Sequence, residues 1–344
     1  AMPEITDIRT KPLQTVAYIL LPVLIGLTVI CYLFWKEFDP HIFTHVSFSL
    51  KTTAFVAIAV IFMLGRDAGL IWRYRRISGN TLSWWQAIRV NILCEFTSAV
   101  TPSAVGGSSL IVVFLNKEGI NAGRSTAMMF ASLFLDELFF VIAIPIILIS
   151  ISIPELFGTT TILSKSIMNL FFLVYMLIVI WTLILYTGLF KKPEWIRDSL
   201  NKIFKIKILK RWKKQVSELG DNLVVSSHAI GKKPFSFWIS AFGATVFSWT
   251  SRFLVVNALL LAFSPVTGKQ LLAFGRQFIL WIVMTVSPTP GGSGFSEYMF
   301  SQYYADFFPI AGTALVIAFI WRIITYYLYL AIGVCVIPGW LKKR

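Results

Sequence analysis

The chain has 344 residues, of which 57% are hydrophobic and only 14% are charged, and its mean hydropathy is +0.75. Soluble domains contain about 45–50% apolar and about 25% charged residues, so this composition excludes a soluble globular protein and indicates an integral membrane protein. The net charge of +15 would suggest a nucleic-acid partner in a soluble chain, but lysine and arginine also accumulate on the cytoplasmic side of membrane spans.

Six apolar stretches are long enough, at about twenty residues, to cross a bilayer as helices. The first follows a short basic segment, but it has no small-residue cleavage site and is too long for the core of a signal peptide. We therefore predict a retained span there and an all-α fold with six crossings. The predicted spans are Val16–Trp35, Phe48–Trp72, Arg124–Ile151, Ile167–Phe190, Phe235–Phe263 and Pro309–Ile337.

Two further apolar stretches, Leu82–Leu115 and Gly268–Tyr304, are interrupted by proline and glycine at residues 101–107 and 287–294. Proline and glycine at this density end a helix rather than bend it, and each half is too short to cross alone. We predict two re-entrant helical hairpins. Irregular backbone of this kind is tolerated at membrane depth where protein or a water-filled cavity solvates it.

The basic residues favour an orientation with both termini in the cytoplasm. The segment 191–233 carries twelve basic and four acidic residues, whereas the predicted outer loops carry few basic residues. This distribution follows the positive-inside rule, predicts a multi-pass protein of the plasma (inner) membrane and requires no nucleic-acid partner. Apolar residues at near-helical spacing indicate an amphipathic helix that binds anionic inner-leaflet headgroups, with a solvated connector as the alternative. Those residues are Ile196, Leu200, Ile203, Phe204, Leu209, Trp212, Val216 and Leu219.

The chain forms one polytopic membrane domain, residues 1–344, whose two halves, 12–152 and 166–338, resemble each other at an offset of 185 to 187 residues. Three crossings per half would leave the halves in opposite orientations, which is the inverted-repeat architecture of secondary transporters. Chance similarity between hydrophobic sequences is the alternative. The matched positions are Thr101 and Pro102 with Ser287 and Pro288, Gly106 and Gly107 with Gly291 and Gly292, Arg66 with Arg252, Arg89 with Arg276, and Glu137 with Arg322.

Ionisable residues within the apolar stretches are expensive to bury and are functional candidates by default. With Asp67 at the membrane interface, the five arginines among them outnumber the carboxylates that could neutralise them. The alternative is that opposite charges pair to hold helices together, for example Asp136 or Glu137 with Arg89. The candidates are Arg66, Arg89, Glu95, Asp136, Glu137, Arg252, Arg276, Glu297 and Arg322.

Spare guanidinium groups suit a phosphate, which they bind in a bidentate manner. The Gly-Gly turns let the backbone approach a ligand, and the following helices direct free N–H groups towards it. We therefore predict a polar cavity that takes the headgroup of an anionic lipid, while the acyl tail stays in the bilayer. His41 and His45 lack further ligands, so we predict neither a metal site nor a cofactor.

Two segments of the second half resemble a known family. The run Ser287–Glu297 is similar to its second re-entrant turn, and Trp321–Tyr327 is similar to its final helix. The family is the flippase-like, lysylphosphatidylglycerol synthase transmembrane-region group, which includes the YbhN-like proteins and the membrane half of the multiple peptide resistance factor. The resemblance extends over nearly the whole chain, although Asp136 and Glu137 stand where the family pattern has a Glu-Arg pair.

The resemblance implies movement of a lipid between leaflets, either an anionic or aminoacylated phospholipid or a polyprenyl-phosphate-linked lipid. We expect no soluble synthase domain and no catalytic constellation. Two alternatives stay open. One is an intramembrane enzyme that acts on a lipid-linked phosphate with Glu95 or Glu297 as general base, and the other is a non-transporting partner in envelope assembly. The sequence is also compatible with a homo-oligomer.

Overall fold

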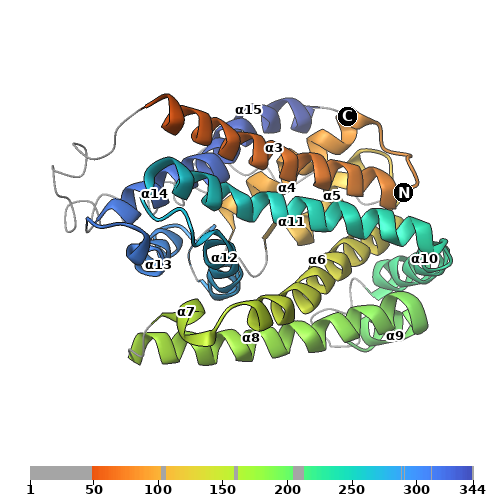
Figure 1. Cartoon of the computed structure of the whole chain (residues 1–344). Coiled ribbons are helices and arrows are strands. Elements are labelled where there is room, and N and C mark those ends of the chain that lie inside the picture. The colour runs from red at the N-terminus through yellow and green to blue at the C-terminus, as the bar shows by residue number, and fades with distance from the viewer. Residues whose placement is uncertain are drawn as a thin grey trace.

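The computed structural model describes residues 49–101, 106–158, 162–203, 213–287, 289, 291–310 and 312–342. Its described residues form helices and connecting turns, without a β-strand (Figure 1). The elements are α3 (Leu50–Ile77), α4 (Trp84–Val100), α5 (Gly106–Lys117), α6 (Ala122–Ser150), α7 (Ile153–Phe157), α8 (Ile162–Tyr186), η1 (Thr187–Lys191), α9 (Pro193–Ile203), α10 (Lys213–Gly231), α11 (Phe235–Phe263), α12 (Gln270–Thr285), α13 (Phe295–Tyr303), η3 (Ala305–Phe307), α14 (Thr313–Arg322), η4 (Ile323–Tyr327) and α15 (Leu328–Lys342).

Within the described residues, five helical stretches are long and apolar enough to cross a membrane, and they match five of the six predicted spans. The first predicted span, Val16–Trp35, lies outside those residues. Side chains of α8 such as Leu173, Leu177 and Leu183 are about 60% exposed, as expected for a helix that faces lipid rather than water. The five stretches are Leu50–Ile77, Ala122–Ser150, Lys165–Lys191, Phe235–Phe263 and Thr313–Ile337.

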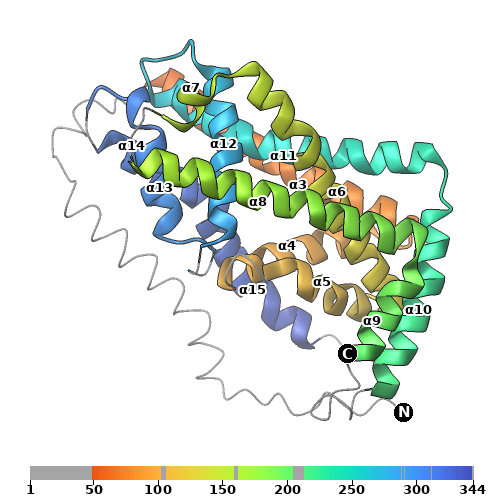
Figure 2. The same cartoon turned by 90° about the horizontal axis from the view of Figure 1, so that it is seen from below.

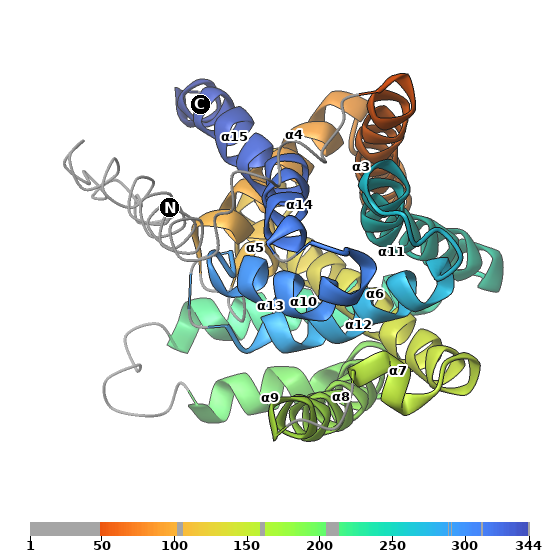
Figure 3. The same ribbon diagram turned by 60° about the vertical axis from the view of Figure 1, so that its left-hand side comes forward.

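Helices α3 and α11 lie side by side along their length (Figures 1 and 3). A Cβ atom on Gly69 would lie 2.9 Å from the Ala244 carbonyl oxygen and 2.9 Å from the Ser248 Cβ atom. The Ser248 hydroxyl donates to the Arg66 carbonyl at 2.9 Å. Small residues allow membrane helices to approach closely, so Gly69 fixes the distance between the helices that carry Arg66 and Arg252.

Replacing Gly69 with alanine is expected to destabilise the protein by about 1–3 kcal/mol, because the added methyl overpacks this contact. The matched control is Gly243→Ala in α11, where an added Cβ meets nothing within 4 Å. There the better helix propensity of alanine is worth up to about 1 kcal/mol of added stability. Thermal unfolding in detergent measures both variants. Equal melting temperatures for the two would show that the α3–α11 contact is not tightly packed at Gly69.

Both interrupted stretches break where the sequence predicts. Helix α4 ends at Val100 and α5 begins at Gly106, and α12 ends at Thr285 before α13 begins at Phe295. Helices α4 and α5 pack against each other, as do α12 and α13. The starts of α3 and α11 are 185 residues apart and those of α4 and α12 are 186 residues apart. The helix bounds therefore reproduce the offset from which the repeat is predicted.

The basic segment 191–233 contains two helices, α9 and α10, which lie side by side at one end of the bundle (Figure 2). Arg197 of α9 contacts Asp221 of α10 at 3.5 Å. Helix α10 also packs on α6, where a Cβ on Gly123 would lie 2.3 Å from the Asn222 Cβ atom, and Leu223 is fully buried. This helix therefore docks on the protein. The predicted apolar positions Phe204, Leu209 and Trp212 lie outside the described residues.

Two apolar clusters lie on either side of a charged layer. The α12–α13 core contains α12 and α13 with the start of α3 and the end of α6, and the α4–α5 core contains α4 and α5 with the opposite ends of those helices. Along α3, Met63 belongs to the α12–α13 core and Leu70 to the α4–α5 core, and Arg66 lies between them. Along α6, Asp136 is in the equivalent place. The charged residues therefore gather where one core ends and the other begins.

Candidate functional site

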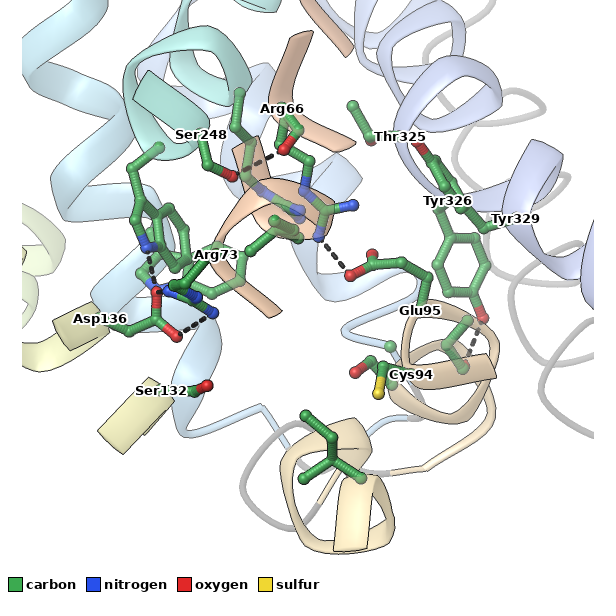
Figure 4. A pocket seen from close by; sticks show the side chains of 18 of the residues that line it. Arg66, Arg73, Cys94, Glu95, Ser132, Asp136, Ser248, Thr325, Tyr326 and Tyr329 are labelled. Carbon is green, nitrogen blue, oxygen red and sulfur yellow. Dashed lines mark hydrogen bonds and ion pairs between the residues drawn. The ribbon is translucent and has the colours of Figure 1, made fainter. Parts of the chain in front are cut away.

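A cavity of about 280 Å³ lies between the two cores (Figure 4). Its walls come from α3, α4, α5, α6, α11, α12 and the last helical stretch, so both halves of the chain contribute. The charged and aromatic residues that line it are Arg66, Arg73, Tyr74, Glu95, Asp136, Trp249, Arg252, Trp281, Arg322, Tyr326 and Tyr329. Of the predicted site residues, the cavity therefore brings together Arg66, Glu95, Asp136, Arg252, Gly291 and Arg322.

Arg66 is shared between two carboxylates. Its Nη1 donates to Asp67 at 2.9 Å and its Nη2 donates to Glu95 (Figure 4). Asp67 also accepts from the hydroxyl of Tyr329 and from Asn91 Nδ2, the latter at 3.2 Å. The sequence-based surplus of arginine depended on Asp67 lying at the membrane interface, and the structure corrects this placement because Asp67 belongs to the network around Arg66.

Arg73 and Asp136 form an ion pair that the sequence did not predict. Arg73 Nη1 and Nη2 donate to the two carboxylate oxygens at 2.5 and 3.0 Å, and Trp249 Nε1 donates to Asp136 Oδ1 at 2.8 Å. The suggested pairing of Asp136 with Arg89 is therefore wrong. Sequence reasoning grouped Arg73 with the basic residues at the end of its span. Its separation of seven residues from Arg66, which puts both on one helix face, was the available signal.

Arg322 holds the break between α12 and α13. Its Nε donates to Glu297 at 3.1 Å and its Nη2 donates to the Gly291 carbonyl at 2.9 Å. Glu297 is fully buried and also accepts from the Gly294 amide and the Ser296 hydroxyl, both at 2.8 Å. Every formal charge of this pair therefore has a partner.

The tips of the two broken stretches meet beside the cavity. The Gly291 amide donates to the Thr101 carbonyl at 3.1 Å, and the Tyr326 hydroxyl donates to the Ala99 carbonyl at 3.0 Å. Gly291 has a φ of +56°, and a Cβ there would lie 2.2 Å from Tyr326 Cε2. Only glycine fits this contact, because both the positive φ and the space exclude a side chain.

Arg252 differs from the other cavity arginines because it makes no ion pair or hydrogen bond with any described residue. Its guanidinium carbon lies 4.6 Å from the centre of the Trp281 ring and 5.9 Å from that of Trp249. Cation–π contacts of this kind stabilise a guanidinium but leave its N–H donors available. Arg252 is therefore the cavity group best placed to bind an anion.

The remaining predicted site residues lie away from the cavity. Arg89 pairs with Glu118 at 2.9 Å. Arg276 contacts Asp306 at 2.6 Å and donates to the Glu155 carbonyl at 2.8 Å. Those two arginines hold helix ends together. Glu137, Thr101, Ser287 and Gly292 do not line the cavity either, Gly106 and Gly107 begin α5, and Pro102 and Pro288 lie outside the described residues.

The charges around the cavity are equal in number but unevenly placed. Four arginines (Arg66, Arg73, Arg252 and Arg322) face four carboxylates (Asp67, Glu95, Asp136 and Glu297). Because Arg66 holds two of the carboxylates, Arg252 is left with none at ion-pair distance in the described part of the chain. The same part contains no group of three potential metal ligands, and His41 and His45 lie outside it.

Comparison with known proteins gives two results. The sequence model of the family described as "Lysylphosphatidylglycerol synthase TM region" matches residues 19–333. A relative from Archaeoglobus fulgidus, named "UPF0104 membrane protein", is 23% identical over 295 residues, which cover 83% of this chain and 86% of the relative.

Proposed function

The chain belongs to the lysylphosphatidylglycerol synthase TM-region family, a membrane-protein family tied to lipid handling, and on that basis we propose that it is a lipid flippase. In this proposal, the cavity between the two cores takes an anionic headgroup from one leaflet and releases it to the other. The observation that carries the proposal is the unpaired guanidinium of Arg252 on the cavity wall.

The substrate is a lipid with a phosphate-bearing headgroup, either an anionic or aminoacylated phospholipid or a polyprenyl-phosphate-linked lipid. Arginine recognises phosphate through bidentate hydrogen bonds. A volume of about 280 Å³ is at the lower limit for pockets that hold drug-sized ligands. It therefore suits a headgroup whose acyl or prenyl tail remains in the bilayer.

The proposed architecture is an inverted repeat with six crossings and two re-entrant hairpins, both termini being cytoplasmic in the plasma membrane. Two ion pairs outside the cavity support the repeat. Arg89 at the start of α4 pairs with Glu118 just after α5, and Arg276 in α12 pairs with Asp306 just after α13. Each pair therefore joins the two arms of one hairpin. The tips of both hairpins meet near the middle, as expected for hairpins that enter from opposite sides.

The helices α9 and α10 support a second contact with lipid. Lys202, Lys232 and Lys233 are exposed on them, and cationic side chains near a membrane surface are attracted to anionic headgroups. We propose that this basic end rests against the inner leaflet.

Lipid movement in vesicles tests the proposed function. Purified protein is reconstituted with a fluorescent phosphatidylglycerol or, in parallel, a fluorescent phosphatidylcholine, and a membrane-impermeant reductant bleaches the outer leaflet. We expect the phosphatidylglycerol label to be bleached beyond the outer-leaflet fraction, faster than in protein-free vesicles and faster than the phosphatidylcholine label. Rates equal to those of protein-free vesicles would overturn the proposal.

The same vesicles test the enzyme alternative. Glu297 is a poor general base because it is fully buried and its carboxylate already accepts three hydrogen bonds, and Glu95 is paired with Arg66. Mass spectrometry of the lipids after the assay would reveal an enzyme by chemical conversion of a lipid-linked phosphate. A flippase leaves the lipid unchanged.

A further inference from the structure

The Arg73–Asp136 pair has an arrangement that the other cavity pairs lack. Both residues line the cavity, and one guanidinium meets one carboxylate through two parallel hydrogen bonds. Arg66 would still hold Asp67 if it lost Glu95, and the carboxylate of Glu297 is sealed from the cavity. Arg73 and Asp136 are therefore the pair that an incoming anion can separate completely.

The geometry of Arg73 suits a phosphate as well as it suits the carboxylate. A planar guanidinium presents the same fork of donors to either oxyanion. The Thr245 hydroxyl accepts from Arg73 Nη1 at 3.2 Å, so α11 helps to keep the guanidinium in place when its partner changes. Arg73 lies seven residues from Arg66 on the same face of α3, and Arg252 faces that level from α11.

Asp136 would lose its only cationic partner in this exchange. It would keep the hydrogen bond from Trp249 Nε1 at 2.8 Å, which a protonated carboxyl can also accept. Glu137, the next residue in α6, makes no hydrogen bond or ion pair with any described residue, so a second uncompensated carboxylate beside it would be strongly unfavourable. The titratable or charged groups around Asp136 are Arg73 and Tyr74 on α3, Cys94 on α4, Glu137 on α6 and Arg252 on α11.

Building on the proposed flippase function, we propose that the headgroup phosphate takes Arg73 from Asp136, and that the released carboxylate takes up a proton from water in the cavity. The carboxylate and H⁺ become a neutral carboxyl, while the phosphate replaces the carboxylate as the counter-charge of Arg73. The site is neutral before and after this exchange. One monoanionic headgroup therefore moves together with one proton, which makes transport electroneutral and drives it by a pH gradient.

The steady-state distribution of lipid under a pH gradient tests this coupling. Vesicles with fluorescent phosphatidylglycerol receive a gradient of one pH unit, a luminal pH dye reports proton movement, and bleaching measures the label in each leaflet. Coupling to one proton shifts the ratio of label between inner and outer leaflets by about tenfold, towards the alkaline side. A membrane potential set with potassium and valinomycin shifts it little.

Asp136→Asn keeps the shape of the carboxyl but cannot exchange a proton, so it is expected to abolish the response to the pH gradient. Asp136→Glu should restore the response. Glu118→Gln, which alters a carboxylate outside the cavity, is the control and should keep it. Lipid movement in the original protein without a shift of the ratio would overturn the proton exchange and leave the flippase standing, and so would a full shift in Asp136→Asn. Absence of lipid movement in the original protein would overturn both proposals. The result with the original protein decides even if Asp136→Asn does not fold.

Discussion

Replacing Arg252 with alanine is expected to slow the movement of anionic headgroups while leaving the protein folded. Hydrogen bonds to a charged group contribute about 1.5–3 kcal/mol, which corresponds to about a 10- to 150-fold loss in apparent affinity. Because Arg252 has no ion pair in the described part of the chain, its removal leaves no buried carboxylate without a partner. The loss therefore falls on the ligand and not on the fold.

The vesicle assay measures this effect at several concentrations of labelled phosphatidylglycerol. Arg252→Lys keeps the charge but loses the bidentate fork, so we expect an intermediate rate. Arg197→Ala is the matched control, because it also removes one arginine, from an ion pair on α9 outside the cavity. An Arg252→Ala protein that moves the lipid as fast as the control would show that Arg252 does not bind the headgroup.

Replacing Glu297 with alanine is expected to have the largest effect on stability. The variant leaves the guanidinium of Arg322, which is also buried, without its anion. Breaking a buried pair in this way costs about 3–5 kcal/mol. It also leaves the Gly294 amide and the Ser296 hydroxyl without their acceptor. Because Arg322 also binds the Gly291 carbonyl, we expect the contact between the hairpin tips to weaken.

Thermal unfolding in detergent tests this expectation. Glu194→Ala, which removes a carboxylate from a half-exposed pair with His228, is the control and should change stability by no more than about 1 kcal/mol. The double variant Glu297→Ala with Arg322→Ala should be more stable than the sum of its two single variants predicts, because it leaves no unpaired charge. A stability change in Glu297→Ala as small as in the control would contradict the assignment of this pair as the support of the hairpin tip.

The sequence was sufficient for the spans and the breaks because both depend on local composition. Apolar length identified the five described spans, and the clustering of proline and glycine located the ends of α4 and α12 to within a few residues. The bundle contacts of α10 were not predictable from its pattern. Leu223 and Gly123 meet only because the chain returns to α6 after α9.

The partners of the buried charges were harder to predict than the charges themselves. Arg66 and Arg252 occupy matched positions in the repeat, yet one holds two carboxylates and the other holds none. This difference depends on Asp67 and Glu95, which have no acidic counterparts in the second half. Arg89 and Arg276 resembled cavity residues because their partners, Glu118 and Asp306, lie in turns that approach them only when each hairpin closes.

Arg73 was missed for a different reason. It is close to Arg75 and Arg76 at the end of a span, where basic residues ordinarily report orientation. In the structure Arg73 is 2% exposed and bound to Asp136, whereas its two neighbours are partly exposed. Helical periodicity separates these cases, because Arg73 shares a face with Arg66 and its neighbours do not.

The most direct test of the central claim, that the cavity binds an anionic headgroup through Arg252, is native mass spectrometry in a lipid mixture of defined composition. The protein is purified in equal amounts of phosphatidylglycerol and phosphatidylcholine, and the lipids that remain bound are counted for the original chain and for Arg252→Ala. We predict that the original chain retains phosphatidylglycerol in preference to phosphatidylcholine and that Arg252→Ala loses this preference. Equal retention of both lipids by the original chain, or an unchanged preference in Arg252→Ala, would contradict the claim.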